Sequence, residues 1–266
     1  MDNPIPANRP FVLFDLGGTL MFDPFPEVLS RLERAMRAGE TPSPFAADAI
    51  AAFMAEWIDV NNRVNFPFAA HFLQEEVFIW QAILRRIDDV DPSARADLPI
   101  MIGELLVAYR QVARQVIGEQ GHLVTLREML SGLAERGVTL GVASNDREYA
   151  TQALLAWTGL APFFRFVFTS EGLSQRYDGA EKPSPVFFDA VRREVGAAAD
   201  HDAGCYYIGD DEKRDVETPR ACGFTTIRLL TELDPAKTWV DNPAHSSADH
   251  VARSVDDLAD LLHCIL

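Results

Sequence analysis

The segment FVLFDLGGTL, residues 11–20, strongly limits how this chain can fold. Four apolar residues lead into Asp15, and the glycines Gly17 and Gly18 follow it. A short run of aromatic and branched side chains that stops at turn residues is typical of a buried strand in a parallel sheet. Asp15 would then stand at the carboxyl edge of the sheet, where open α/β folds bind ligands. On its own, a strand that ends in Asp is better explained by turn chemistry, because Asp hydrogen-bonds its own backbone two residues on.

Residues 122–266 alternate between strand patterns and helix patterns. Strands are predicted at residues 138–143, 164–168, 206–208, 225–229 and 250–251, and helices at residues 126–137, 149–157, 186–195, 216–222 and 258–262. This alternation is typical of βαβ units, in which helices cover both faces of a parallel sheet. The predicted fold class is therefore α/β with a doubly wound parallel sheet.

Residues 22–121 contain no convincing strand pattern. Apolar residues recur at helical spacing around residues 28–36, 50–57, 72–84 and 102–116, and prolines separate these stretches. The pattern predicts a four-helix insertion that packs as its own small bundle. The predicted core therefore consists of residues 1–21 and 122–266, and the insertion of residues 22–121.

Charge and composition exclude several classes of partner. The formal net charge is −16 and the pI is about 4.7, so nucleic acids and anionic membranes would be repelled. No apolar stretch reaches membrane-spanning length, and the first ten residues lack the apolar region of a signal peptide. The three cysteines are odd in number and lack metal-ligand spacing, which favours a reducing compartment. We expect a cytoplasmic protein with a small-molecule ligand, and the oligomeric state stays open.

Polar residues stand at the predicted strand ends and helix starts in four places. They are Asp15, the pair Ser144 and Asn145, Lys182, and the group Asp210, Asp211 and Asp215. The carboxyl ends of neighbouring parallel strands meet at one edge, so these groups are expected to converge. Carboxylates this close would repel one another unless a cation compensated them. Oxygen ligands in an open arrangement suit Mg²⁺, which binds alongside phosphate.

Lys182 and Ser144 suit the same anionic ligand. Lys182 is one of only three lysines, with Lys213 and Lys237, and its ammonium could pair with Asp15 and meet a phosphoryl oxygen. Ser144 could donate a hydrogen bond to that oxygen, and Asn145 could cap the next helix. Each residue also has an ordinary explanation, since Lys182 could be a solvated loop lysine and Ser144 could serve only as a helix cap.

Taken together, these motifs resemble those of the haloacid dehalogenase-like hydrolase superfamily. Four segments in the family's order carry the resemblance: FDLGGTL at residues 14–20, ASN at residues 143–145, EKPSP at residues 181–185, and IGDDEKRD at residues 208–215 followed by RACGF at residues 220–224. The resemblance implies a Rossmann-like core, with the helical insertion at residues 22–121 similar to the family's C1 cap.

The resemblance also implies a role for each residue. Asp15 would attack phosphorus and form an aspartyl-phosphate. Asp15, the carbonyl of Gly17 and Asp210 would hold Mg²⁺, with Asp211 or Asp215 as a further ligand or as a water-bridged neighbour. The phosphoryl group would be gripped by Ser144, Lys182 and the backbone N–H groups of Leu16 and Gly17, beside Asn145. The implied activity is a Mg²⁺-dependent phosphatase for a small phosphorylated metabolite.

Gly17 departs from the family pattern. The family's phosphatases usually carry at this position a second Asp that protonates the leaving group, and glycine can move no proton. General acid–base help is worth about 10² to 10⁴ in rate, so the substrate would need a good leaving group or another proton donor. His71, His122 and Asp23 are the candidate donors, although His71 is better explained as a cap core residue and Asp23 as a turn residue before Pro24.

The alternatives to a phosphatase are two other hydrolytic activities and a binding protein without catalytic activity. Phosphonate hydrolysis would need a cap lysine, and residues 22–122 contain none, so this activity is close to excluded. A 2-haloacid dehalogenase would work without a metal and tends to have an uncharged residue where this chain has Asp210. A non-catalytic or regulatory protein that binds a phospho-ligand is less compatible with the presence of Asp15, Ser144 and Lys182.

Overall fold

The computed structural model describes residues 9–21, 25–40, 98–195, 204–230 and 246–266. The chain forms two compact units, one of Met1–Phe22 with Gly121–Leu266 and the other of Asp23–Gln120. The helices predicted around residues 50–57 and 72–84 lie outside the described residues.

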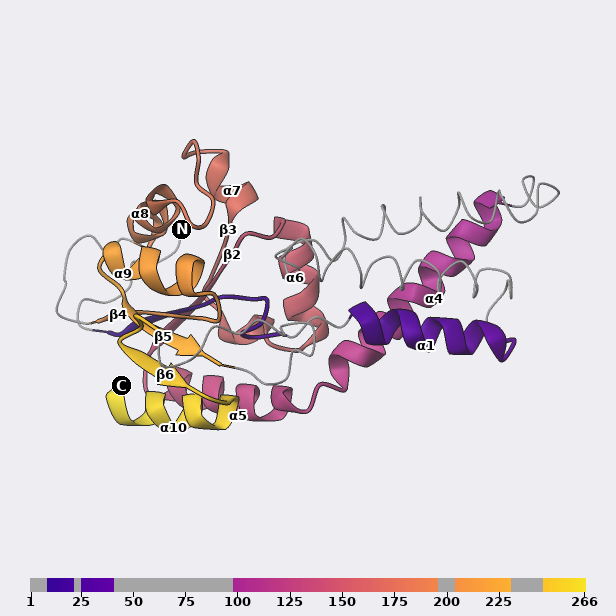
Figure 1. The fold of residues 1–266 in the computed structure, drawn as a ribbon, viewed down its shortest axis with the longest axis horizontal. Helices are drawn as coiled ribbons and strands as arrows, with labels where there is room; N and C mark the ends of the chain where they lie inside the picture. Colours follow the sequence, from indigo (N-terminus) through magenta and orange to yellow (C-terminus); the bar gives the residue numbers. More distant parts are fainter. Residues whose placement is uncertain (1–8, 22–24, 41–97, 196–203, 231–245) are drawn as a thin grey trace. The chain divides into compact units, whose positions relative to one another are not determined.

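In the first unit, the described residues contain a six-stranded sheet in which all pairs are parallel (Figure 1). The strands are β1 (Phe11–Phe14), β2 (Thr139–Ser144), β3 (Phe166–Thr169), β4 (Cys205–Gly209), β5 (Thr225–Leu229) and β6 (His250–Ala252), in the order β3-β2-β1-β4-β5-β6. All four residues of β1 are buried, as expected of a strand covered on both faces. The predicted α/β class with a parallel sheet is confirmed.

The strand order decides where a ligand can bind. Phe14 at the end of β1 pairs with Val142 of β2 on one side and with Ile208 of β4 on the other. The chain winds outward from β1 in both directions, so β1 and β4 flank the point where the order reverses. Open α/β sheets bind ligands outside the carboxyl ends of the strands at this point. The residues that follow β1, β2 and β4 therefore share one edge of the sheet.

Helices cover the two faces of the sheet, with α8 and α9 over one face and α5 and α10 over the other (Figure 1). The helices of this unit are α5 (His122–Glu135), α6 (Glu148–Trp157), α7 (Ser170–Ser174), α8 (Pro185–Glu194), α9 (Thr218–Ala221) and α10 (Val255–Ile265). Beneath α8, the rings of Phe188 and Tyr207 lie 5.3 Å apart, edge to face, and Phe224 closes the cluster. This packing buries the Tyr207 side chain of β4 beneath α8.

Several predicted elements begin at other residues than expected, and local structure explains two of these differences. The helix predicted at residues 216–222 starts earlier, as a π-helical segment Glu212–Glu217 that continues into α9. Asp211 caps this segment by accepting a hydrogen bond of 2.8 Å from the Arg214 N–H, a local bond that hydrophobic periodicity does not report. The strand predicted at residues 164–168 starts at Phe166, because Ala161–Phe163 form a 3₁₀ turn.

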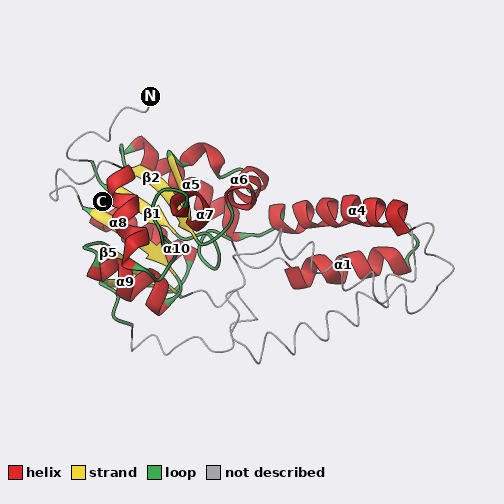
Figure 2. Cartoon of the chain, turned by 90° about the horizontal axis from the view of Figure 1, so that it is seen from above, coloured by secondary structure: helices red, strands yellow, loops and turns green. Residues whose placement is uncertain are grey.

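The described part of the second unit contains helices α1 (Phe25–Arg37) and α4 (Leu98–Gly118), which pack side by side (Figure 2). Val28, Leu29 and Leu32 of α1 are buried, at the positions that helical spacing predicts. Arg31 of α1 donates to Glu119, just beyond α4, over 2.6 Å. No helix among the described residues is both long and apolar enough to cross a lipid bilayer.

Candidate active site at the carboxyl edge of the sheet

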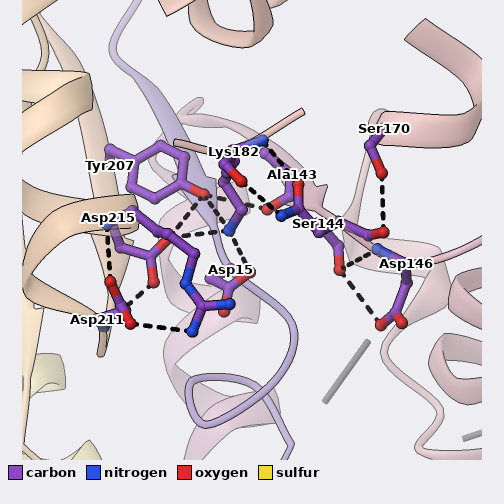
Figure 3. Close-up of polar contacts among 11 residues, drawn as sticks. Asp15, Ala143, Ser144, Asp146, Ser170, Lys182, Tyr207, Asp211 and Asp215 are labelled. Carbon is purple, nitrogen blue, oxygen red and sulfur yellow. Dashed lines mark hydrogen bonds and ion pairs between the residues drawn. The ribbon is translucent and has the colours of Figure 1, made fainter. Parts of the chain in front are cut away.

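Lys182 stands at the centre of the polar groups at this edge (Figure 3). Its Nζ donates to Asp15 Oδ1 over 2.6 Å, to Asp215 Oδ1 over 2.8 Å and to the Tyr207 hydroxyl over 3.0 Å. All four residues are buried. The three donors of the ammonium are therefore all used, and the lysine is not the solvated loop residue that was the alternative.

Asp15 leads directly into a tight, buried turn. Gly18 has a φ of 75°, which favours glycine, and its N–H donates to the Met21 carbonyl over 2.7 Å. The Met21 N–H in turn donates to the Leu16 carbonyl over 2.9 Å. Leu16 and Gly17 are held inside this turn, next to the Asp15 carboxylate. The double glycine read from the sequence thus closes the loop that presents Asp15.

Asp215 reaches the site because Gly209 has no side chain. A Cβ atom at Gly209, the last residue of β4, would overlap the Asp215 side chain. The Asp215 carboxylate therefore packs directly on the end of β4, and its Oδ2 accepts a hydrogen bond of 3.2 Å from the Asp211 N–H. The glycine before the acidic group is required for this close approach.

Burial and the paired charges shift the ionisation of the central groups. Burial alone would lower the pKa of Lys182, but the Asp15 and Asp215 carboxylates outweigh it and raise that pKa well above its ordinary value. Burial raises the pKa of the Tyr207 hydroxyl well above its ordinary value, so Tyr207 is a neutral phenol. Burial also raises the pKa of Asp215 to about 6, against the effect of Lys182. The site therefore favours any additional cation that would stabilise its carboxylates.

Three carboxylates could hold such a cation. Among the described residues, Asp15, Asp210 and Asp215 each offer one oxygen, and these oxygens lie within 4.8 Å of one another. An all-oxygen donor set with few protein ligands fits the chemistry of Mg²⁺. Arg228, a buried residue of β5, donates from Nε to the Asp210 carbonyl over 3.2 Å and so holds the backbone that carries this ligand.

Asp211 lies outside this group of carboxylates, although it was a candidate ligand. Its Oδ1 accepts the Arg214 N–H, and its Oδ2 accepts from the Arg214 guanidinium over 2.9 Å. The carboxylate thus caps the helical segment and pairs with a cation on the same turn. Of the two alternatives left open by the sequence, the geometry favours Asp215 as the further ligand.

Asn145 has a different role from the helix cap that was expected. Helix α6 begins only at Glu148, and Arg147 in the N-cap position makes no side-chain capping bond. The Asn145 side chain instead accepts the Lys182 N–H and donates to the Lys182 carbonyl, each over 2.8 Å. Both ends of the amide are committed to the backbone of Lys182, so Asn145 positions that residue rather than the α6 terminus.

Ser144 ends β2 at the same edge of the sheet, where it is buried and hydrogen-bonded to Asp146. Its Oγ lies 3.3 Å from Asp146 Oδ2 and accepts the Asp146 N–H over 3.1 Å. Ser170, at the start of α7, donates to the Asn145 carbonyl over 2.8 Å and braces this loop. The loop after β2 is therefore tied to both the Lys182 segment and α7.

Tyr207 and Asp146 are parts of this site that the sequence reading missed. Tyr207 was visible only as one of the apolar residues of a strand, yet its hydroxyl donates to the Ala143 carbonyl over 3.1 Å while it accepts from Lys182. Asp146 directly follows the Ser144–Asn145 pair in the chain. This position next to a strand-end motif is the sequence feature that indicates a place in the site.

Of the three candidate proton donors for the Gly17 position, His122 alone lies among the described residues. His71 and Asp23 lie outside the described residues. The His122 ring is within 3.2 Å of the Leu20 carbonyl through Nε2, and burial lowers its pKa in spite of this bond. His122 is thus tied to the chain just beyond the Asp15 turn and favours the neutral form.

The fold, the four strand-end motifs and the buried lysine between two aspartates together define a hydrolase class. The family model for haloacid dehalogenase-like hydrolases matches residues 11–223. The chain belongs to this family of hydrolases, as the resemblance predicted. The match includes Asp15, Ser144, Lys182, Asp210 and Asp215.

Curated relatives of this chain are phosphatases of low identity. A phosphoglycolate phosphatase from Rhodospirillum rubrum is 28% identical over 81% of this chain and 77% of its own length. A ribulose-1,5-bisphosphate 5-phosphatase from Halopiger xanaduensis is 26% identical over 94% of this chain and 98% of its own. A glyceraldehyde 3-phosphate phosphatase from Methanocaldococcus jannaschii is 24% identical over 62% of this chain, and the match spans 65% of that relative, slightly less than two thirds.

Solved structures share the fold. The HAD-hydrolase YfnB from Bacillus subtilis, solved with bound magnesium, aligns with a TM-score of 0.55 over 96% of this chain and 99% of its own, at 19% identity. At this identity the likeness is one of fold.

Proposed function

We propose that this hydrolase is a Mg²⁺-dependent phosphatase of a small phosphorylated metabolite, with residues 22–121 acting as a helical cap. The observation that carries the proposal is the buried Lys182 ammonium, which bridges Asp15 and Asp215 at the point where the sheet order reverses. A nucleophilic carboxylate, a fixed cation and a set of metal-binding oxygens are the parts that phosphoryl transfer needs. The names of the three relatives support a phosphate ester as the substrate.

The reaction would proceed in two displacements at phosphorus. An oxygen of Asp15 forms a bond to phosphorus while the bond between phosphorus and the ester oxygen breaks. The departing ester oxygen takes a proton from water. Water then attacks the aspartyl-phosphate, loses its proton to solvent, and releases phosphate and free Asp15. Lys182 and the Ser144 hydroxyl would bind the phosphoryl oxygens in both steps, together with backbone N–H groups of Leu16 and Gly17.

Asp15, Asp210 and Asp215 would hold the metal, with the Gly17 carbonyl as a further oxygen ligand. When bound, Mg²⁺ would supply positive charge that offsets the phosphoryl oxygens and the three carboxylates. The family membership, the clustered oxygens and the magnesium found in YfnB support this choice of ion.

The overall charge supports the proposed choice of partner. A net charge of −16 opposes nucleic acid and anionic membrane surfaces, so a small ligand steered by local positive groups is the better fit. The cysteines Cys205, Cys222 and Cys264 are free thiols, which supports a cytoplasmic location.

The first test is a screen of phosphorylated metabolites with Mg²⁺, beginning with 2-phosphoglycolate, glyceraldehyde 3-phosphate and ribulose 1,5-bisphosphate. Phosphate release that depends on Mg²⁺ and is abolished by Asp15→Asn would support the proposal. The exposed Asp178→Asn is the matched control, because it makes the same chemical change away from the site. Release of halide from 2-chloropropionate in EDTA, without phosphatase activity, would instead favour the dehalogenase.

A second measurement separates a slow enzyme from a binding protein. Beryllium fluoride with Mg²⁺ mimics a phosphoryl group on a competent aspartate. An Asp15 adduct detected by ¹⁹F NMR would show that the nucleophile is functional even if the substrate has not been found. A protein that binds phosphate esters but forms no adduct and releases no phosphate would be the non-catalytic alternative.

A further inference from the structure

Asp146 is a buried acid that the mechanism above does not use. It is 1% exposed and lies two residues beyond Ser144, the last residue of β2. Its Oδ2 is 3.3 Å from Ser144 Oγ, and the Asp146 N–H donates to Ser144 Oγ over 3.1 Å (Figure 3). Asp146 therefore contacts the hydroxyl that is proposed to bind the phosphoryl group, from the side of the loop.

The surroundings of Asp146 favour a neutral carboxylic acid. Its Oδ1 is buried and has no hydrogen-bond partner within the described part of the chain, so an ionised carboxylate would be poorly solvated there. Burial, and after it the charge of Asp15, raise the pKa of Asp146 to about 8, against the opposing effects of the Ser144 hydrogen bond and the Lys182 charge. Asp15 and Lys182 are the charged groups that act on it among the described residues.

The protonation state of Asp146 decides where the Ser144 hydrogen points. An ionised Asp146 can only accept, so the Ser144 hydroxyl must donate to Oδ2 and is directed away from a ligand. A protonated Asp146 can donate through Oδ2 to Ser144 Oγ, which has lone pairs for it and for the Asp146 N–H. The Ser144 hydrogen is then free to bind a phosphoryl oxygen.

We propose that Asp146 is a positioning residue that donates its proton in a hydrogen bond to Ser144 Oγ and so turns the Ser144 hydroxyl toward the bound phosphoryl group. This inference rests on the proposed phosphatase function of the same site. The proton stays on Asp146 throughout, and no bond to substrate is formed by it. Because Asp146 keeps its proton, it also places no additional negative charge near the phosphoryl group.

The experiment compares the pH dependence of turnover in the wild type, Asp146→Asn and the exposed control Asp178→Asn. In the wild type and in the control, kcat/KM should fall about tenfold per pH unit above an alkaline pKa. Asp146→Asn should lower kcat/KM at neutral pH, because an amide donates more weakly than a carboxylic acid, but its alkaline decline should disappear. An amide N–H does not titrate in this range. The same alkaline decline in Asp146→Asn as in the wild type would overturn the inference.

A double substitution tests whether Asp146 acts through Ser144. In a Ser144→Ala background, Asp146→Asn should cause no further loss of kcat/KM, because the hydroxyl that it orients is gone. Independent, multiplied losses from the two substitutions would assign Asp146 another role and overturn the proposal.

Binding of tungstate to the wild type with Mg²⁺ tests the inference without a known substrate. It also does not require Asp146→Asn to fold. Tungstate is a tetrahedral oxyanion whose charge does not change between neutral and mildly alkaline pH. Wild-type affinity for tungstate should fall about tenfold per pH unit above the pKa of Asp146, and affinity that stays constant to about pH 9.5 would contradict the inference. Because the readout is binding, this result is independent of whether the phosphatase proposal itself fails.

Discussion

Lys182 Nζ lies 2.6 Å from Asp15 Oδ1, although 167 residues separate the two in the chain. The same nitrogen contacts Asp215 on its other side, and all three side chains are buried. Removing the lysine would therefore leave two buried carboxylates without their shared partner. Several consequences of this arrangement can be measured.

Lys182→Met should reduce both activity and stability. Loss of the fixed cation at the phosphoryl group is expected to lower kcat/KM by about 10² to 10³. Breaking a buried ion pair typically costs about 3 kcal/mol, and Mg²⁺ should restore part of the free energy of unfolding by binding the uncompensated carboxylates. Urea denaturation with and without Mg²⁺ measures this, with the exposed Lys213→Met as control. Equal stability losses in the two variants would argue against the bridge.

Asp210→Asn and Asp211→Asn should affect metal dependence differently. Asp210 belongs to the group of clustered oxygens, whereas the Asp211 carboxylate is occupied by Arg214. We expect Asp210→Asn to raise the Mg²⁺ concentration for half-maximal activity by about 10-fold or more, and Asp211→Asn to leave it nearly unchanged. A titration of phosphatase activity with Mg²⁺ measures both values. A larger shift for Asp211→Asn would reverse the assignment of the ligand.

Gly209→Ala should destabilise the protein and distort the site. The new Cβ would overlap the Asp215 side chain, and overpacking of this kind costs about 1 to 3 kcal/mol. Thermal unfolding and kcat/KM should both decline. Gly132→Ala, in α5, is the control of opposite sign: a Cβ there meets nothing within 4 Å, and alanine stabilises a helix relative to glycine by up to about 1 kcal/mol. A neutral Gly209→Ala would show that Asp215 does not need the close approach.

His122 should make the free energy of unfolding depend on pH. Burial holds its pKa below the ordinary 6.5, so the unfolded chain binds more protons than the folded protein as the pH falls below about 6.5. Stability is therefore lost as the pH falls through this window and retained above it. Urea denaturation between about pH 5 and pH 7.5 should show a shallower decline for His122→Gln than for the wild type or the exposed control His263→Gln. A decline of equal slope in all three proteins would assign the effect to other groups.

Gly17 should make turnover sensitive to the leaving group. Without an acid at this position, a poor leaving group such as benzyl alcohol should be expelled about 10² times more slowly than phenol of similar shape. The comparison of kcat/KM for benzyl and phenyl phosphate measures this dependence. Gly17→Asp should reduce the ratio, and Gly17→Asn, which has the same size and no acid, should not. Equal rates for the two esters in the wild type would show that another group already supplies the proton.

Much of this structure was predictable from local patterns. The strand bounds Phe11–Phe14 and Thr225–Leu229 match the predicted residues, because an apolar run between turn residues is specified within a few positions. The convergence of Asp15, Ser144, Lys182 and Asp210 at one edge followed from the parallel alternation, since consecutive βαβ units place strand ends together. Periodicity did not reveal the early start of the helical segment after Asp211, where a side-chain cap sets the first residue.

What the sequence determined by itself is the fold class and the set of polar residues at one edge of the sheet, because hydrophobic period and turn residues act over short distances. Only the tertiary structure decided which partners these residues take. Asp211 and Asp215 look alike in the chain, yet the turn of the helical segment gives one to Arg214 and the other to Lys182. Likewise, Asp146 is buried in the folded protein, and its position in the chain does not show this burial. Pairing and burial depend on residues that are far apart in the chain, so they are properties of the packed core.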